Sequence, residues 1–176
     1  MEKVRSGSRE FVKLDILHDE NLKNISKNYG LDILSKEDWD WLVKSWHRLP
    51  GWKDSSKGLL RLKSKFIIAS QSNGNIELIL NMSKNSKLYW DMILGSEVVG
   101  YYKPQPEAYL VACEKAMQKY KPKALISVDL YGHSCDYDAI LDLCEKYNVL
   151  LIEDSAEALG SDYKGKKCGS FGEMGI

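Results

Sequence analysis

The chain has 176 residues, of which 44% are hydrophobic and 28% are charged, a composition typical of a soluble globular protein. Lysine plus arginine and aspartate plus glutamate both number 25, so no net charge favours nucleic acid or an anionic membrane. No apolar run approaches the roughly 20 residues that span a bilayer, and the four cysteines lack the CxxC spacing of metal and redox sites.

The N-terminal third of the chain predicts helices. Residues 11–30 form the first helix, with apolar side chains at three- and four-residue spacing and Gly30 as its stop. Ser35 and Asp38 make a capping-box-like start for a second helix, which Pro50 and Gly51 end. This helix is rich in tryptophan, and a helical core face is favoured over a ligand platform for Trp39, Trp41, Trp46 and Trp52.

A strand, a polar turn and a helix follow. Residues 57–63 predict a short helix, and the continuous apolar run at 66–70 predicts a strand buried on both faces. Ser72-Asn73-Gly74 forms a turn before a helix that contains Ile76, Leu80 and Met82, and residues 106–119 predict a further helix. Parallel sheets bind ligands at the carboxyl ends of their strands, where Ser72 and Asn73 would lie.

The same alternation continues after Pro122. Residues 124–128 predict a strand, 136–147 a helix, and 149–152 a second strand that ends in Glu153-Asp154. Residues 163–168 predict a hairpin that turns at Gly165.

The segment 120–123 is too short to separate two domains, so we expect strands 66–70 and 124–128 side by side and parallel in one sheet. The predicted fold class is α/β: a three-layer, mostly parallel, Rossmann-like sheet with an N-terminal helical cap-like segment.

Three strings in the first part of the chain resemble one enzyme family. WHRLPGW (46–52), GLLRLKSKFIIASQSNGN (58–75) and WDMILGSEVVGYYKPQPEAYL (90–110) are similar to type II 2-haloacid dehalogenases of the haloacid dehalogenase (HAD) superfamily. The resemblance covers residues 10–118 and implies cap helices over 11–50 and a core fragment over 57–118. It also implies hydrolysis of a carbon–halogen bond through an aspartyl ester, without a cofactor.

The dehalogenase resemblance assigns roles to four residues. Ser72 would position the anionic group of the substrate, Asn73 would donate an amide N–H beside it, and Tyr109 would lie near the substrate. Lys103 would hold the nucleophilic carboxylate ionised, because a nearby cation lowers a carboxylate pKa. Ser72 and Lys103 are therefore the catalytic candidates. The family's nucleophilic aspartate and substrate-clamping arginine have no match here, since Asp15 lies in a cap-helix context.

The last part of the chain resembles a different family. DLYGHSCDYDAI (129–140) and LLIEDSAEALGSDYKGKKCGSFGEMGI (150–176) are similar to the DegT/DnrJ/EryC1/StrS aminotransferases, which use pyridoxal phosphate (PLP), often on nucleotide-linked keto-sugars. The resemblance covers residues 121–176. It implies that Asp154 pairs with the protonated pyridine nitrogen, which keeps PLP an electron sink. Glu157 falls where many relatives have a glutamine near the cofactor ring.

Other residues of this part carry weaker predictions. His133 is favoured as a loop or capping histidine over a cofactor ligand. The Schiff-base lysine has no match in residues 1–176, because the lysines near the end of the chain belong to the predicted hairpin: Lys164, Lys166 and Lys167. PLP is therefore implied by the resemblance but not expected to bind.

The two resemblances together predict a truncated fusion of 1–118 and 121–176 with no complete active site, and they leave open whether the chain is an enzyme. Two alternatives remain: a non-catalytic module that binds small anions at Ser72, Asn73 and Lys103, and an aminotransferase or hydrolase completed by another chain. We expect no metal, nucleic-acid or membrane partner; a small anionic substrate and a homo-oligomer stay open. The basic N-terminus lacks the apolar segment of a secretory signal, which predicts a cytoplasmic protein.

Overall fold

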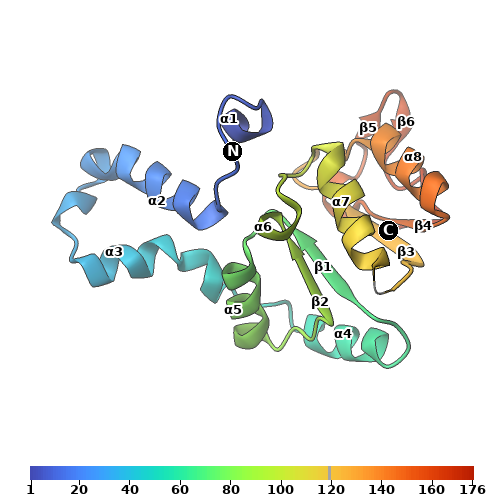
Figure 1. Cartoon of the computed structure of the whole chain (residues 1–176), viewed down its shortest axis with the longest axis horizontal. Helices are drawn as coiled ribbons and strands as arrows, with labels where there is room; N and C mark the ends of the chain where they lie inside the picture. The colour runs from blue at the N-terminus through green and yellow to red at the C-terminus, as the bar shows by residue number, and fades with distance from the viewer. Residues whose placement is uncertain (119) are drawn as a thin grey trace. The chain divides into compact units, whose positions relative to one another are not determined.

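The computed structural model of the chain describes residues 1–118 and 120–176 (Figure 1). It divides into two compact units, Met1–Tyr102 and Lys103–Ile176. This structural boundary precedes the segment near 118–121, where the sequence resemblance changes from one family to the other. The two units therefore do not coincide with the predicted parts 1–118 and 121–176. Parallel strands joined by helices occur in both units, which confirms the predicted α/β class.

Helices make up most of the first unit. They are α1 (Glu2–Arg5), α2 (Leu14–Ile25), η1 (Ser26–Tyr29), η2 (Leu31–Ile33), α3 (Lys36–Val43), η3 (Ser45–Arg48), α4 (Ser55–Lys63), α5 (Ile76–Ser86) and α6 (Ser96–Val99). The predicted start and stop signals are confirmed. Gly30 ends η1 in the left-handed region at φ 63°, and the Asp38 N–H donates to Ser35 Oγ at 3.1 Å.

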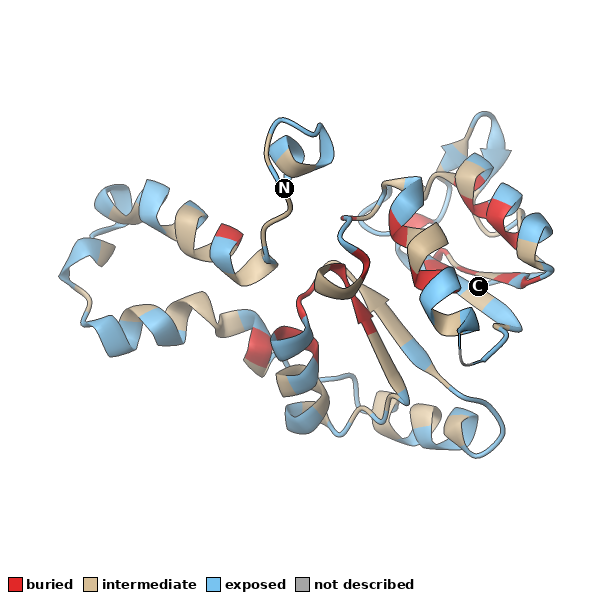
Figure 2. Ribbon diagram, viewed as in Figure 1, coloured by how far each residue is buried: buried red, intermediate tan, exposed pale blue. Residues whose placement is uncertain are grey.

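The predicted core face of tryptophans is wrong. α3 buries no residue, and three of the four indoles are more than half exposed: Trp41 62%, Trp46 54% and Trp52 86%. Two of these rings contact polar side chains: the Arg48 guanidinium lies 3.9 Å from the Trp41 ring centroid, and His18 stacks on Trp46. Figure 2 shows how few buried residues α2 and α3 contain. The tryptophans therefore follow a helical period, but the helix face that carries them does not pack against a core.

The first unit has a two-stranded parallel sheet of β1 (Ala69–Ser72) and β2 (Met92–Gly95), with Ser72 opposite Gly95. The strand begins later than the predicted 66–70, and the expectation of burial on both faces is wrong. Phe66 is 56% exposed and Ile67 is 52% exposed. The physical reason is that, among the described residues, β1 pairs with β2 alone, so no third strand extends over this apolar run.

The second unit alternates strands and helices as predicted. Its elements are α7 (Pro106–Met117), β3 (Ala124–Val128), α8 (Tyr137–Tyr147), β4 (Leu150–Asp154), η4 (Ala156–Ala158), β5 (Asp162–Tyr163), β6 (Lys166–Lys167) and β7 (Met174–Gly175). Its main sheet has the order β3-β4-β7, and its neighbouring strands run parallel. The hairpin of β5 and β6 turns at Lys164 and Gly165, which both have positive φ, as a type I′ turn requires. Residue 119, where the predicted helix 106–119 was to end, lies outside the described residues.

The prediction that strands 66–70 and 124–128 lie side by side in one sheet is wrong. β1 is hydrogen-bonded to β2, and β3 is hydrogen-bonded to β4. In each case a helix connects the pair, α5 in the first unit and α8 in the second. Such strand–helix–strand units pair strands that are consecutive along the chain, which accounts for two parallel sheets.

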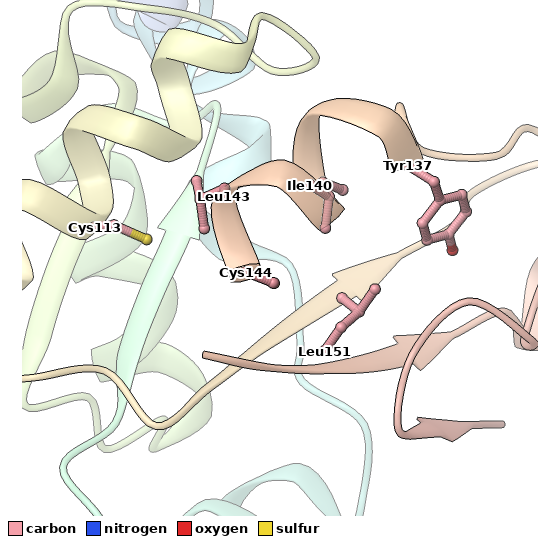
Figure 3. Packing of buried hydrophobic residues seen from close by; sticks show 6 residues of the cluster. All are labelled: Cys113, Tyr137, Ile140, Leu143, Cys144 and Leu151. Atoms are coloured by element: carbon pink, nitrogen blue, oxygen red, sulfur yellow. The ribbon is translucent and has the colours of Figure 1, made fainter. Parts of the chain in front are cut away.

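The largest apolar cluster lies in the second unit. Its buried members are Cys113, Tyr137, Ile140, Leu143, Cys144 and Leu151, contributed by α7, α8 and β4 (Figure 3). Partly buried side chains extend it: Leu125 of β3, Tyr163 and Phe171 among them. The Phe171 ring stacks on Tyr137 with a centroid separation of 4.2 Å. This cluster fixes α8 on one face of the sheet and positions the loops at the strand ends.

Candidate functional site

The turn after β1 carries the first two predicted site residues, Ser72 and Asn73. The Gly74 N–H donates to Ser72 Oγ at 3.0 Å, and the fully buried Ser96 donates its hydroxyl to the Asn73 carbonyl at 2.7 Å. The Ser96 N–H also donates to the Gly74 carbonyl at 3.2 Å. Ser96 therefore holds this turn in place. Sequence reasoning missed it, because an isolated serine after a strand has no distinctive pattern.

A network of hydrogen-bonded polar side chains, two of them buried, lies beside this turn. The Asp15 carboxylate accepts from Asn75 Nδ2 at 2.9 Å and lies 3.0 Å from His47 Nε2, while His47 Nδ1 lies 3.0 Å from Asn81 Nδ2. His47 is 4% exposed and Asn75 is 2% exposed. The network connects α2, η3 and α5. Both oxygens of Asp15 are engaged in it, which supports a structural role for Asp15.

Lys103 and Tyr109 belong to the second unit, whereas Ser72 and Asn73 belong to the first. Lys103 is partly buried, and this burial lowers the pKa of its ammonium, an effect that the nearby Cys135 opposes. Tyr109 lies on α7 and packs against the apolar cluster. Burial, together with Cys135 and Asp136, raises the pKa of its phenol, so Tyr109 is protonated at neutral pH. The four dehalogenase-type residues thus form two pairs, each described within its own unit.

The carboxyl ends of β3 and β4 bring the aminotransferase-type residues together. Asp154 is the last residue of β4, and its Oδ1 accepts from the Ala156 N–H at 3.3 Å. Glu157 follows on η4, and its carbonyl accepts from the Gly132 N–H at 2.9 Å, which ties it to the loop after β3. His133 is exposed in that loop, where its N–H donates to the Leu130 carbonyl at 3.0 Å. Asp154 and Glu157 therefore flank one strand end, as the doubly wound pattern predicts.

Asp129 is a buried carboxylate at this strand end. It is 1% exposed, and its carboxylate accepts from Tyr137 Oη, Ser155 Oγ and the Cys135 N–H, each at 2.7 Å. Burial alone would raise the pKa of Asp129, but these hydrogen bonds outweigh it and place the pKa below its usual value.

Both carboxylate oxygens of Asp129 accept hydrogen bonds from protein groups. Burial and the same carboxylate raise the pKa of the Cys135 thiol to about 12, so Cys135 is a protonated, unreactive thiol at neutral pH. Asp129 directly follows β3, whereas Asp154 is the last residue of β4 and lies opposite Val128.

Glu153, next to Asp154, is a second buried carboxylate with a structural role. It is 0% exposed, and it accepts from the backbone N–H of Gly169 at 2.7 Å and from that of Gly172. The Glu173 N–H donates to the Leu151 carbonyl at 2.9 Å, which adds a third link between this loop and β4. Alternation along β4 turns Glu153 inward and Asp154 to the opposite face. Asp154 is therefore the carboxylate that this strand presents to a ligand.

The geometry fits the ring end of PLP. A partly buried carboxylate at a strand end, as at Asp154, would hold a protonated pyridine nitrogen. When bound, PLP supplies an electron sink for carbanion chemistry. Within residues 1–118 and 120–176, no group of three or more His, Cys, Asp or Glu side chains could hold a metal ion. No helix in the same ranges has the length and apolar character needed to cross a membrane.

Comparison with known sequences finds a similarity over the second part of the chain. A family model of the DegT/DnrJ/EryC1/StrS aminotransferase family matches residues 100–176. GDP-perosamine synthase of Escherichia coli O157:H7 is 52% identical over 54 residues, which are 31% of this chain and 15% of that protein. The chain spans less than a fifth of the length of the curated aminotransferases that it matches first.

Comparison with solved structures finds a similarity to a different class of protein over most of the chain. The defluorinating L-2-haloacid dehalogenase Rha0230 has a TM-score of 0.72 and 32% identity, covering 94% of this chain and 65% of that one. The L-2-haloacid dehalogenase PA0810 has a TM-score of 0.72 and 30% identity, covering 88% of this chain and 62% of that one. Both predicted resemblances, to haloacid dehalogenases and to DegT-type aminotransferases, are therefore confirmed.

Proposed function

We propose that this chain joins a part derived from a 2-haloacid dehalogenase to a part derived from a PLP-dependent sugar aminotransferase, and that residues 1–176 catalyse neither reaction by themselves. The observation that carries the proposal is the state of three carboxylates, two near strand ends and one on α2. Asp129 and Glu153 are buried and saturated by protein donors, and both oxygens of Asp15 are engaged by other side chains. None of the three is available to attack a carbon–halogen bond.

The dehalogenase reaction needs an exposed, ionised carboxylate close to a cation. The sequence of residues 1–176 offers no match to the family's nucleophilic aspartate, although Ser72, Asn73, Lys103 and Tyr109 match its other site residues. The roles of these four residues stay predictions from the resemblance, two in each unit. The cysteines do not replace the missing group, since burial raises the pKa of Cys113 to about 11 and that of Cys135 to about 12.

The aminotransferase reaction needs a lysine that forms an imine with the cofactor. Asp154 and Glu157 match residues near the cofactor ring, but the hairpin lysines do not match the Schiff-base lysine. Lys164 pairs with Asp138, and Lys167 donates to the Gly160 carbonyl at 2.9 Å. We infer that PLP binding by these residues is weak, because a single carboxylate contact leaves the phosphate and the ring face unassigned.

A spectroscopic titration tests the aminotransferase half of the proposal. Purified protein is titrated with PLP, and the absorbance band of an internal aldimine is followed, with Asp154→Asn and the exposed control Asp142→Asn in parallel. We expect no saturable aldimine band in any of the three proteins. A band that saturates with stoichiometric PLP, and that Asp154→Asn weakens while Asp142→Asn does not, would show a working cofactor site.

A second candidate function is a non-catalytic module that binds small anions. What supports it is the dehalogenase resemblance, in which Lys103 matches the family's cationic residue. Calorimetric titration with a small 2-halocarboxylate tests it. Equal affinity of the wild type and Lys103→Ala would exclude Lys103 from such a pocket.

A further inference from the structure

A cavity of about 340 Å³ opens near the start of β2 in the first unit. It is bounded by α5, by Lys63 at the end of α4, and by the loop 87–91 that leads into β2. β1 and β2 run parallel and Ser72 is the last residue of β1, so the cavity lies at the opposite end of this sheet from Ser72. Its volume falls in the lower part of the range of about 300–1,000 Å³ that small-molecule sites occupy.

The loop 87–91 is held in place at both of its ends. Lys87 ends α5 in the left-handed region at φ 54°, which turns the chain out of the helix direction. At the other end, the Asp91 carboxylate pairs with the Lys63 ammonium, and its Oδ2 accepts from the Ile68 N–H at 3.0 Å. The cavity is therefore shaped by fixed backbone contacts of the fold.

Apolar and aromatic side chains make up one part of the cavity wall. They come from α5, from the loop and from β2: Leu80, Leu88, Tyr89, Trp90 and Ile93. Leu80 is 40% exposed and Tyr89 is 38% exposed, so a ligand that covers them removes apolar surface from water. The two aromatic rings offer flat faces against which a planar group packs well.

The polar side chains of the cavity wall supply hydrogen-bond donors and positive charge. Among the residues that the structure describes, the ammonium groups of Lys84 and Lys87 form no ion pair or hydrogen bond. The Tyr89 hydroxyl and the Trp90 indole N–H are likewise without a protein partner in that part of the chain. No aspartate or glutamate lines the cavity, and its third ammonium, that of Lys63, is already paired. Two positive charges of the wall are thus unbalanced.

The mixed character of the wall limits the chemistry of the ligand. An inorganic anion would pair with the lysines but would leave the apolar side chains in water. A neutral apolar molecule would cover those side chains but would offer no acceptor to the unpaired donors. A cation would be repelled by the two ammonium groups. A ligand that satisfies both parts of the wall carries an anionic group on a planar apolar body.

We propose that this cavity binds a small organic anion, a planar ring system that bears a carboxylate, sulfonate or phosphate group. The ring system packs against Leu80 and Trp90, and the anionic group pairs with Lys84 and Lys87. The site uses no residue that either family resemblance assigns. It therefore gives the first unit a binding function that is independent of dehalogenase and aminotransferase chemistry.

Binding of a model aromatic anion to the full chain tests the proposal. The probe is 2-naphthoate, and its control is 2-naphthalenemethanol, which has the same ring system without the charge. Isothermal titration calorimetry at low ionic strength measures both affinities, because salt screens exposed charges. We expect saturable binding of 2-naphthoate and binding about fivefold weaker for the alcohol, since each exposed ion pair strengthens binding by about 1.5- to fivefold.

A double variant and a matched control locate the charge effect. Lys84→Gln combined with Lys87→Gln should weaken 2-naphthoate binding about fivefold and leave binding of the alcohol within about twofold, because only the anion pairs with the lysines. Lys57→Gln, at an exposed position of α4 outside the cavity, should leave both affinities within about twofold. All three lysines are exposed, so the substitutions retain the fold, which circular dichroism checks.

Nuclear magnetic resonance of the wild type gives a readout that needs no variant. Addition of 2-naphthoate should shift the backbone amide resonances of Lys63 and of residues 80–93. The proposal is overturned if 2-naphthoate does not bind saturably, or if the wild type binds it no more tightly than the alcohol. It is also overturned if the double variant binds 2-naphthoate as tightly as the wild type, or if the shifts lie outside these residues.

Discussion

Replacing Asp129 by asparagine should destabilise the second unit more than any other single carboxylate-to-amide change at its strand ends. Oδ2 accepts from the hydroxyls of Tyr137 and Ser155, and Oδ1 accepts from the Cys135 N–H. An asparagine keeps one oxygen. The side-chain amide loses fewer hydrogen bonds when its oxygen takes the place of Oδ2 and accepts from the two hydroxyls. Its NH₂ group then faces the Cys135 N–H, so two donors oppose each other at a position that is 1% exposed.

The magnitude follows from the bonds lost. One buried backbone donor without a partner costs about 1–3 kcal/mol, and two charge-assisted bonds become neutral ones, which costs about 0.5–1 kcal/mol each. The expected loss is therefore about 3 kcal/mol in the free energy of unfolding. The matched control is Asp142→Asn on the exposed side of α8, where a surface change should stay within about 0.5 kcal/mol.

Urea unfolding followed by far-ultraviolet circular dichroism measures both variants. Tryptophan fluorescence would not report on this unit, because the five tryptophans lie between residues 39 and 90. The pH dependence has a definite sign. The pKa of Asp129 is lowered in the folded state, so its contribution is complete above the unfolded pKa of about 3.9 and is lost as pH falls through the folded pKa. The wild type should exceed Asp129→Asn by a constant amount near neutral pH and by less in acid. Equal stability of the two proteins at pH 7 would refute the role of Asp129.

Three further predictions concern groups away from Asp129. Asp15→Ala should cost about 3 kcal/mol in unfolding free energy, because it leaves the buried His47 and Asn75 without an acceptor. The control Asp40→Ala, on the exposed side of α3, should cost less than about 0.5 kcal/mol. Equal losses for the two variants in denaturant titrations would contradict the structural role of the network. Glu153→Gln should accelerate hydrogen exchange in residues 168–173, because Gly169 and Gly172 lose a charged acceptor. The control Glu145→Gln, at an exposed position, should leave exchange in that segment unchanged. Unchanged exchange in both variants would show that Glu153 does not hold the loop. Gly172→Ala should lower the midpoint of thermal unfolding, because the added Cβ would lie 2.5 Å from the Leu151 carbonyl oxygen. The control Gly58→Ala in α4 brings its Cβ near no other atom and should stabilise the protein by about 0.5–1 kcal/mol. An unchanged midpoint for Gly172→Ala would mean that the loop relaxes freely.

Local signals in the sequence predicted the helices and strands well. Ser35, Gly30 and Asp136 begin or end helices through backbone contacts that depend on the neighbouring few residues, so their types were sufficient. The hairpin at Gly165 follows from the same local logic. These elements carry their own conformational signals, and no distant contact was needed to place them.

Predictions that depended on distant packing were less successful. An apolar pattern shows which side chains share a helix face, but not whether another element covers that face. The exposed Trp41 and Trp46 show this for α3, and the exposed Phe66 shows it for the run before β1. The pairing of β3 with β4 instead of β1 is a second case, since strand period does not specify the neighbouring strand.

The candidate site shows the same division. Asp154 and Glu157 could be assigned because a specific string surrounds them, and the strand end where they lie was confirmed. Asp129, Ser96 and the Asp15–His47 pair were missed as structural centres, because each has a partner more than 20 residues away in the sequence. The roles of Ser72, Asn73, Lys103 and Tyr109 stay predictions from the dehalogenase resemblance.

Halide release from L-2-chloropropionate by the purified chain tests the central claim most directly. The account predicts release no faster than in buffer, with the wild type and Lys103→Ala indistinguishable, because no residue of the sequence matches the family's nucleophilic aspartate and the carboxylates of Asp15, Asp129 and Glu153 are engaged by protein donors. Release over many turnovers that Lys103→Ala abolishes would contradict it, since a working dehalogenase site would then exist in this chain.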